Sequence, residues 1–184
     1  SGEKELKGRG ISYCATCDAK YFNDKEVLVI GGGNSAVEES EYITRFAGKL
    51  TIVHQFDRLT ANKQAQEKVF RNPKISIIFN TEPRAFTREG DKIITEAENL
   101  KTGERSRLVS DGVFIFIGMK PNIGLFRDKL ALDQWGYIKT DEDMRTSIPG
   151  VYAVGDVISK KYRQITTAVA DGTIAAMSIA KELD

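Results

Sequence analysis

Cysteine and histidine are scarce in this chain. Its 184 residues include two cysteines, Cys14 and Cys17, and one histidine, His54. A structural zinc site needs about four ligands of these kinds, and His54 lies far from the cysteines in the sequence. The sequence therefore argues against an intrachain zinc knuckle, and we expect no metal site.

An excess of charge and a long apolar run are also missing. The 27 lysines and arginines balance the 26 aspartates and glutamates, so nothing indicates a nucleic acid partner. No apolar run approaches the roughly 20 residues that span a bilayer, and the first segment, SGEKELKGRG, lacks the apolar core of a signal peptide. We therefore expect a soluble, cytoplasmic protein with no membrane partner. The chain opens on Ser1, which is compatible with a processed tag, a cleavage product or an internal fragment.

The cysteines lie close together in SYCATCD, residues 12–18. A disulfide across so short a loop restricts the unfolded chain very little, and a reducing cytosol would not preserve it for structural reasons. The spacing does let one thiolate form a mixed disulfide while the other resolves it. We interpret Cys14 and Cys17 as a redox-active dithiol, with Asp18 as a candidate proton donor or acceptor. The alternative is a pair of small, buried apolar side chains.

A glycine-rich turn follows between two apolar runs. Residues 26–30 are typical of a buried strand, residues 50–54 resemble its parallel partner, and apolar residues at helical spacing lie between them. In the pattern G-x-G-x-x-A, Gly31 permits a tight bend, Gly33 lets the backbone approach a pyrophosphate, and Ala36 keeps helix and strand close. Amides at the helix start can hold phosphate. The sequence predicts nucleotide binding, with a merely tight turn as the alternative.

The residues after the second strand do not identify the nucleotide. A free ribose 2′-hydroxyl usually meets an acid about 20 residues after the glycine turn, whereas a 2′-phosphate calls for arginine. Gln55 and Phe56 occupy the positions where either signature is expected. Asp57 or Arg58 could substitute or could be solvated loop charges, and His54 could touch the ribose or be an ordinary residue at a strand end.

The middle of the chain predicts further α and β elements. Residues 61–71 are typical of a short helix, and residues 74–79 of a strand. Glycine-containing turns separate three later segments, which favours an antiparallel meander. These segments lie near residues 82–88, 91–98 and 104–110.

A change of pattern marks the end of this region. Residues 112–118, GVFIFIG, predict a fully buried strand. Gly118 and Pro121 then bracket a change to irregular patterning, where we place a domain boundary.

The last part of the chain predicts a turn and a helix. Residues 148–157, IPGVYAVGDV, predict a short buried strand that delivers Gly155 and Asp156. A glycine and an acid just before a helix favour a site for a polyol or ribityl hydroxyl. We expect the small-residue face of the helix within residues 162–183 to pack in the core beyond Ala168. That face comprises Ile165, Ala168, Gly172, Ala175 and Ile179.

Five segments, in this order, resemble the low-molecular-weight, flavin-dependent thioredoxin reductases. They cover nearly the whole chain. The segments are KGRGISYCATCD, VLVIGGGNSAVEE, GVFIFIGMKPN, TSIPGVYAVGDV and YRQITTAVADG.

The resemblance implies a domain organisation. In this family a nicotinamide-binding domain with the cysteine pair is inserted into a flavin-binding domain. Residues 1–10 would end the first flavin-domain segment, residues 11–112 would form the nicotinamide-nucleotide domain, and residues 113–184 would be the carboxy-terminal flavin-domain segment. The expected fold class is α/β: a three-layer Rossmann-like domain with a β-meander, followed by part of a second, FAD-binding Rossmann-like domain.

The resemblance also implies site residues. Cys14 and Cys17 match the redox pair, with Cys17 expected nearer the flavin, and Asp18 matches the family's acid. The expected nicotinamide-nucleotide contacts are Gly31, Gly33, Asn34, Ser35, Ala36 and, beside the nicotinamide, Glu38. The expected flavin contacts are Gly155, Asp156, Arg163, Gln164 and Ile165.

The chain departs from the family at the nucleotide phosphate. The family holds the 2′-phosphate of NADPH with arginines in a motif that opens with His-Arg-Arg. This chain has Gln55, Phe56 and Thr60 at the arginine positions. Each lost charge-assisted bond costs about 1.5 to 3 kcal/mol, so we expect no strong preference for NADPH over NADH.

A second departure concerns FAD. The family's amino-terminal strand, glycine turn and helix, which hold the flavin pyrophosphate, have no counterpart in this sequence. We therefore expect the polypeptide alone to bind flavin weakly or not at all and to expose an apolar face. We also expect it to be part of a longer chain or to pair with another fragment, and the family's habit implies a homodimer.

The implied function is a flavin-dependent disulfide oxidoreductase. It would pass two electrons from a reductant through FAD to the Cys14–Cys17 disulfide and on to thioredoxin or a similar small disulfide protein. One alternative is a family member supplied by NADH, ferredoxin or another flavin. An alternative of another class is a non-catalytic nucleotide-binding or interaction module that has lost its flavin half.

Overall fold

The computed structural model describes residues 1–183. Contacts within the chain divide it into two compact units, one from Ser1 to Gly118 and one that begins at Met119. This division coincides with the boundary predicted from the change of pattern between Gly118 and Pro121, whereas the division between residues 112 and 113 that the resemblance implies falls inside the last strand of the first unit. The assignment of residues 1–10, 11–112 and 113–184 to flavin and nicotinamide domains stays a prediction.

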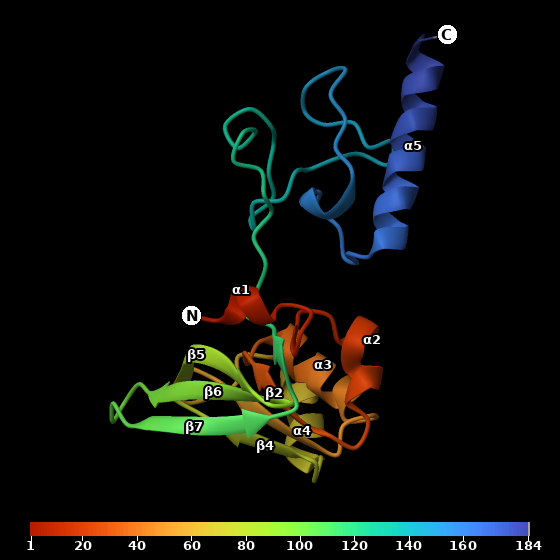
Figure 1. The fold of residues 1–184 in the computed structure, drawn as a ribbon. Helices are drawn as coiled ribbons and strands as arrows, with labels where there is room; N and C mark the ends of the chain where they lie inside the picture. The colour runs from red at the N-terminus through yellow and green to blue at the C-terminus, as the bar shows by residue number, and fades with distance from the viewer. Residues whose placement is uncertain (184) are drawn as a thin grey trace. The chain divides into compact units, whose positions relative to one another are not determined.

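A parallel five-stranded sheet forms the centre of the first unit (Figure 1). Its strands are β1 (Ile11–Ser12), β2 (Glu26–Ile30), β3 (Lys49–Val53), β4 (Ile75–Ile78) and β8 (Gly112–Ile115). They lie in the order β1–β8–β2–β3–β4, and each neighbouring pair is parallel. Parallel neighbours require crossover connections, so helices return the chain between β2, β3 and β4.

Helices cover one face of this sheet. Asn62 defines one helix start, because its side chain accepts the Ala65 amide at 2.9 Å. The helices on this face are α2 (Ala15–Asp18), the 3₁₀ turn η1 (Ala19–Phe22), α3 (Asn34–Ile43) and α4 (Lys63–Arg71). The short helix α1 (Glu3–Leu6) packs its Leu6 in the core on the other face.

An antiparallel sheet of three strands covers the other face. Its strands are β5 (Thr81–Glu89), β6 (Lys92–Asn99) and β7 (Arg105–Ser110), in sequence order. The turns between them contain Gly90 and Gly103, both at positive φ, as the predicted meander requires.

Successive side chains of the central strands point to opposite faces of the parallel sheet, and they form one core on each face. Val27 and Val29 pack with apolar residues of α3 and α4, including Val37. Leu28 and Ile30, which point the other way, pack with residues of the meander such as Phe86. The predicted α/β class, with a three-layer Rossmann-like arrangement and a β-meander, is confirmed.

The second unit consists mostly of irregular backbone. It contains the 3₁₀ turn η2 (Gly155–Val157) and the long helix α5 (Ile165–Leu183). Within residues 1–183, no helix is both long and apolar enough to cross a membrane. The buried apolar cluster of the unit is small and comprises Ile123, Leu130, Ile138, Ala153 and Ile158.

Two predicted strands are wrong in extent. The strand expected over residues 112–118 ends at Ile115, and Ile117 is 71% exposed. No buried strand precedes Gly155 in the described chain. Tyr152 makes only an isolated bridge to Arg145, and without a continuous neighbour the alternating apolar residues there do not form a strand.

The predicted buried face of α5 is correct only in part. Of the residues expected in the core beyond Ala168, Ala175 is buried at 6% exposed, but Ile179 is 37% exposed. The helix also buries Asp171 and Ser178, which share a face with Ala175 at helical spacing. The apolar and small-residue pattern did not reveal these two residues, because both are polar.

Candidate functional site

The two cysteines form a disulfide at the start of α2. The Cα atoms of Cys14 and Cys17 lie 5.3 Å apart. The Cys14 sulfur accepts a hydrogen bond from the Cys17 amide at 3.2 Å, and the Thr16 hydroxyl lies 3.3 Å from the same sulfur. Cys17 is exposed and Cys14 is partly exposed. Neither residue belongs to the core, which argues against the alternative of two buried apolar cysteines.

A buried serine connects Asp18 to the backbone of the disulfide. Ser12, in β1, is only 6% exposed. Its hydroxyl donates to the Asp18 carboxylate at 2.6 Å and accepts the Cys14 amide at 3.1 Å. A hydroxyl has one proton, and its approach to the Cys14 carbonyl is longer, at 3.3 Å. The proton therefore belongs to the contact with Asp18, which is held beside the cysteine pair.

The glycine turn after β2 has the tight bend that the motif requires. Gly31 has a φ of 134°, a region that favours glycine. A Cβ at this position would lie 2.4 Å from the Phe116 carbonyl oxygen and 3.1 Å from the Ala36 Cβ. Ala36 itself is fully buried. At these two positions the structure leaves no room for larger side chains between helix and strand.

At Gly33, which caps α3, neither the backbone conformation nor the neighbouring protein atoms require a glycine. Its φ of −83° and ψ of −177° are open to any residue, and a Cβ would come no closer than 3.8 Å to the Thr60 hydroxyl. The first amides of α3, from Asn34 onward, have no intrahelical acceptor. Open space beside free amides fits a phosphate group of a nucleotide.

A cavity of about 780 Å³ opens at this turn, within the first unit. It is lined by the ends of β2, β3 and β8 and by the start of β5. Its volume lies in the range of small-molecule sites. Of the predicted nucleotide contacts, it brings together Gly31, Gly33, Asn34 and Ser35.

His54 lines this cavity and holds a buried polar atom without a partner. The residue is only 5% exposed, and its Nε2 atom makes no hydrogen bond within the described chain. Burial lowers the pKa of His54 below its usual value, although a hydrogen bond with the Arg58 backbone opposes this. The ring is therefore neutral near pH 7. A neutral imidazole does not supply the positive charge that favours a 2′-phosphate.

Glu38 lies outside this cavity. Its carboxylate accepts a hydrogen bond from the Asn62 amide group at 3.1 Å. The same Asn62 donates its backbone N–H to the Asn34 side chain at 2.7 Å. Asn62 thus joins the starts of α3 and α4 and holds Asn34, a role that sequence reasoning missed because the two residues come from different elements.

The cavity has little positive charge to offer a 2′-phosphate. Gln55, Phe56 and Thr60 line it where arginines were expected. Arg84 also lines it, but its guanidinium pairs with Glu82 at 2.9 Å and with Glu98 at 3.1 Å. The cation is already neutralised by its own neighbours.

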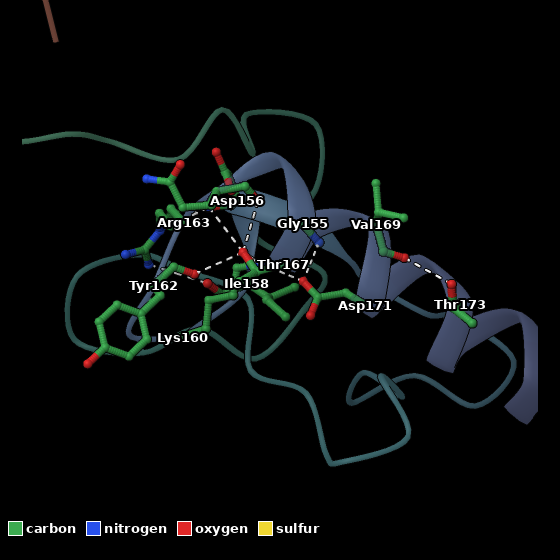
Figure 2. A network of polar contacts seen from close by, with 11 residues as sticks. Gly155, Asp156, Ile158, Lys160, Tyr162, Arg163, Thr167, Val169, Asp171 and Thr173 are labelled. Atoms are coloured by element: carbon green, nitrogen blue, oxygen red, sulfur yellow. Dashed lines mark hydrogen bonds and ion pairs between the residues drawn. The ribbon is translucent and has the colours of Figure 1, made fainter. Parts of the chain in front are cut away.

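Three of the predicted flavin contacts in the second unit, Gly155, Asp156 and Arg163, lie near the start of α5 (Figure 2). Gly155 has a φ of 80°, and Asp156 is exposed with no side-chain hydrogen bond within residues 1–183. The Arg163 guanidinium donates to the Asp156 carbonyl at 3.3 Å and lies 3.8 Å from the centre of the Tyr137 ring. Gln164 precedes the helix, and Ile165 opens it. A free carboxylate beside a glycine turn fits a hydroxyl-bearing ligand.

A metal site in a protein needs several ligating side chains close together. Within residues 1–183, no group of three or more histidines, cysteines, aspartates or glutamates is arranged to hold a metal ion.

Comparison with known proteins identifies the family. A family model described as pyridine nucleotide-disulphide oxidoreductase matches residues 1–172. The chain belongs to this family. It is 47% identical over 191 residues to a thioredoxin reductase of Peptoclostridium acidaminophilum, a match covering all of this chain and 60% of the relative. It is 46% identical to a "34.2 kDa protein in rubredoxin operon" of Clostridium pasteurianum, over 97% of this chain and 58% of that protein.

A solved structure agrees with these relatives. The thioredoxin reductase of Streptococcus pyogenes MGAS5005 is similar with a TM-score of 0.90 and 45% identity, over 99% of this chain and 60% of that one. The resemblance to thioredoxin reductases is confirmed. The chain spans about 60% of the length of the relatives that it matches.

Proposed function

We propose that this chain is the disulfide- and nucleotide-bearing part of a flavin-dependent disulfide oxidoreductase of the thioredoxin reductase type. One observation carries the proposal: an accessible Cys14–Cys17 disulfide lies in the same unit as a glycine-turn cavity that fits a dinucleotide. The thioredoxin reductases among its relatives, the family match and the exposed disulfide all favour this function over a non-catalytic module.

The proposed reaction reduces one disulfide and oxidises another. FAD supplies two-electron transfer from a reductant when it is bound. The Cys14–Cys17 disulfide takes up two electrons and two protons to become a dithiol. One thiolate of that dithiol attacks the partner's disulfide, and the second thiolate displaces the reduced partner and restores the bond.

We propose different roles for the two sulfurs, supported by their surroundings. The Cys17 amide donates to the Cys14 sulfur, which favours negative charge on that sulfur after reduction. We therefore assign the attack on the partner to Cys14, and the position nearer the flavin to Cys17. Asp18, held by Ser12, supplies or takes the proton at a departing thiolate.

The flavin site needs residues beyond this chain. Gly155, Asp156 and Arg163 lie at the start of α5, where the flavin's hydroxyl-bearing chain is expected. α5 also exposes large apolar side chains such as Val169 and Met177, at 63% and 60%. An amino-terminal flavin-domain segment would cover such residues and supply the second glycine turn. We also propose a cytoplasmic homodimer with a thioredoxin-like partner.

For the reductant, we propose a nucleotide without a 2′-phosphate. Among the described residues that line the cavity, Arg84 is the one lysine or arginine, and it is already paired; His54 is neutral, so the lining disfavours NADPH relative to NADH. Stopped-flow reduction of the bound flavin by NADH, NADPH and reduced ferredoxin tests this. Fastest reduction by NADH is expected; fastest reduction by ferredoxin establishes the alternative donor, and fastest reduction by NADPH contradicts the proposal.

Arginines placed at the end of β3 should create a preference for NADPH. In the Gln55→Arg/Phe56→Arg variant, two new guanidinium groups can bond the 2′-phosphate. The ratio of the kcat/KM values for NADPH and NADH should rise roughly 10- to 100-fold, as charge-assisted bonds predict. Steady-state kinetics with both nucleotides measures the ratio, with the exposed Arg71→Gln variant as a surface-charge control. An unchanged ratio would mean that the ribose of the bound nucleotide does not lie near residues 55 and 56.

Loss of the Ser12 hydroxyl should slow disulfide chemistry. In Ser12→Ala, Asp18 loses a 2.6 Å bond to its carboxylate and is no longer held beside the cysteine pair. We expect reduction of the Cys14–Cys17 disulfide by dithiothreitol to slow roughly tenfold, the size of one hydrogen bond to a charged group. Quenched alkylation with mass detection measures this rate, and Ser12→Thr should restore it. A Ser12→Ala variant that reacts at the wild-type rate would remove Ser12 from the site.

Whole-protein turnover tests the proposed function. The flavin-loaded protein, with the segment that completes its flavin site, should be yellow and should reduce thioredoxin with a suitable donor. A colourless preparation that binds a nucleotide and leaves thioredoxin oxidised would favour the non-catalytic module instead.

A further inference from the structure

A largely buried ion pair lies beside the Gly155–Asp156 turn of the second unit (Figure 2). Lys160 donates to the Asp171 carboxylate at 2.6 Å, and the two side chains are only 14% and 12% exposed. The same oxygen, Oδ2, accepts the Gly155 amide at 3.0 Å. One carboxylate oxygen thus joins η2, the loop after it and α5.

The turn itself explains why an acceptor is needed there. Gly155 has a φ of 80°, and its N–H is bonded to Asp171 in the interior of the unit. A buried N–H without an acceptor is costly, so the Asp171 carboxylate satisfies it. A buried carboxylate in turn needs a counter-ion, which Lys160 supplies.

Lys160 also reaches the first turn of α5. Its ammonium group donates to the Thr167 hydroxyl at 3.3 Å, and that hydroxyl donates to the Gln164 carbonyl at 2.9 Å. On the other side of the turn, Arg163 donates to the carbonyls of Asp156 and Ile158. The loop between η2 and α5 is therefore held from two directions by side chains of its own unit.

We infer that Lys160 and Asp171 are positioning residues that preorganise the Gly155–Asp156 turn for the flavin. This rests on the proposed function, because Asp156 is the group that would meet a flavin hydroxyl. Neither residue contacts that ligand position itself. They act by fixing the backbone that presents Asp156, so the binding site does not have to order this loop when the ligand arrives.

Substitutions can distinguish the contribution of the ion pair from that of the hydrogen bond with the Gly155 amide. Asp171→Asn keeps an oxygen for the Gly155 amide but leaves Lys160 buried without a counter-ion. Lys160→Met removes that charge at similar length, and the double variant removes both charges. Lys161→Met is the matched control, because Lys161 is the neighbouring, exposed lysine of the same loop, over the Tyr162 ring.

The first measurement uses the 184-residue chain without flavin. Amide hydrogen exchange at Gly155, followed by NMR, should accelerate roughly tenfold or more in Asp171→Asn and in Lys160→Met, because opening of the turn exposes this amide. The double variant should exchange more slowly than Asp171→Asn, since no unpaired charge remains. Lys161→Met should match the wild type. Equal exchange in all variants would overturn the positioning role.

The second measurement uses the flavin-loaded protein. The dissociation constant for FAD, from the quenching of flavin fluorescence, should rise roughly tenfold in Asp171→Asn, while affinity for the nucleotide in the first unit stays unchanged. Wild-type affinity for FAD in this variant would overturn the positioning role. A wild-type protein that binds no FAD contradicts the proposed function instead, and the Gly155 exchange rates still decide whether the ion pair holds the turn.

Discussion

Replacement of either cysteine by serine should abolish turnover of a disulfide protein. In Cys14→Ser or Cys17→Ser, no dithiol can form, so the two-electron path ends before the partner. We expect kcat for thioredoxin reduction to fall on the order of 10³-fold or more, as removal of a reacting nucleophile does. Steady-state thioredoxin reduction with the flavin-loaded variants measures the loss.

The two variants should differ in which step fails. With Cys14 present and Cys17 replaced, the remaining thiolate can still attack a partner and become trapped as a mixed disulfide, because no second thiol resolves it. Cys14→Ser should trap far less. Because the loop is short, loss of the bond costs at most about 2 kcal/mol of stability, and urea unfolding checks that both variants fold. Turnover that survives in both folded variants contradicts the dithiol step.

Substitutions at the two glycines of the nucleotide turn should have different effects, one on the free energy of unfolding and the other on nucleotide affinity. Gly31→Ala forces a Cβ to within 2.4 Å of the Phe116 carbonyl oxygen at a φ of 134°. Strain and overpacking together should lower the free energy of unfolding by roughly 2 to 5 kcal/mol. Urea unfolding of the chain measures this change.

Gly33→Ala serves as the matched partner of that substitution. Its Cβ meets no protein atom closer than 3.8 Å, so the free energy of unfolding should change by less than about 1 kcal/mol. Affinity for NADH, from titration calorimetry, should nevertheless fall roughly tenfold or more, because the methyl group takes space that the pyrophosphate needs. If Gly33→Ala binds NADH as the wild type does, the glycine turn does not hold the nucleotide.

Strong local patterns made the first unit predictable. The apolar runs at residues 26–30 and 50–54, and the glycine turn between them, specify strand, turn and helix without help from distant residues. The glycines at the meander turns, Gly90 and Gly103, were equally local signals and predicted those turns. Two cysteines three positions apart, followed directly by an acid, are likewise a local signal, and the structure joins the two sulfurs.

The parts that could not be predicted depend on contacts between distant segments. Asp171 is buried because Gly155 and Lys160 reach it from another loop, so no periodic pattern marks it. Ser12 looks like any strand serine until the chain folds back and places Asp18 against it. The exposed Ile179 shows the reverse case, since this apolar residue was assigned to a core that does not cover it within the described unit.

Trapping of the sulfurs during a single reduction tests the central claim most directly. The flavin-loaded protein is reduced anaerobically with its donor, quenched with an alkylating reagent before and after addition of oxidised thioredoxin, and analysed by mass spectrometry at residues 12–18. The account predicts that Cys14 and Cys17 are both alkylated after reduction and are protected again once thioredoxin is added. A disulfide that stays intact while the flavin is reduced and thioredoxin is turned over would contradict it.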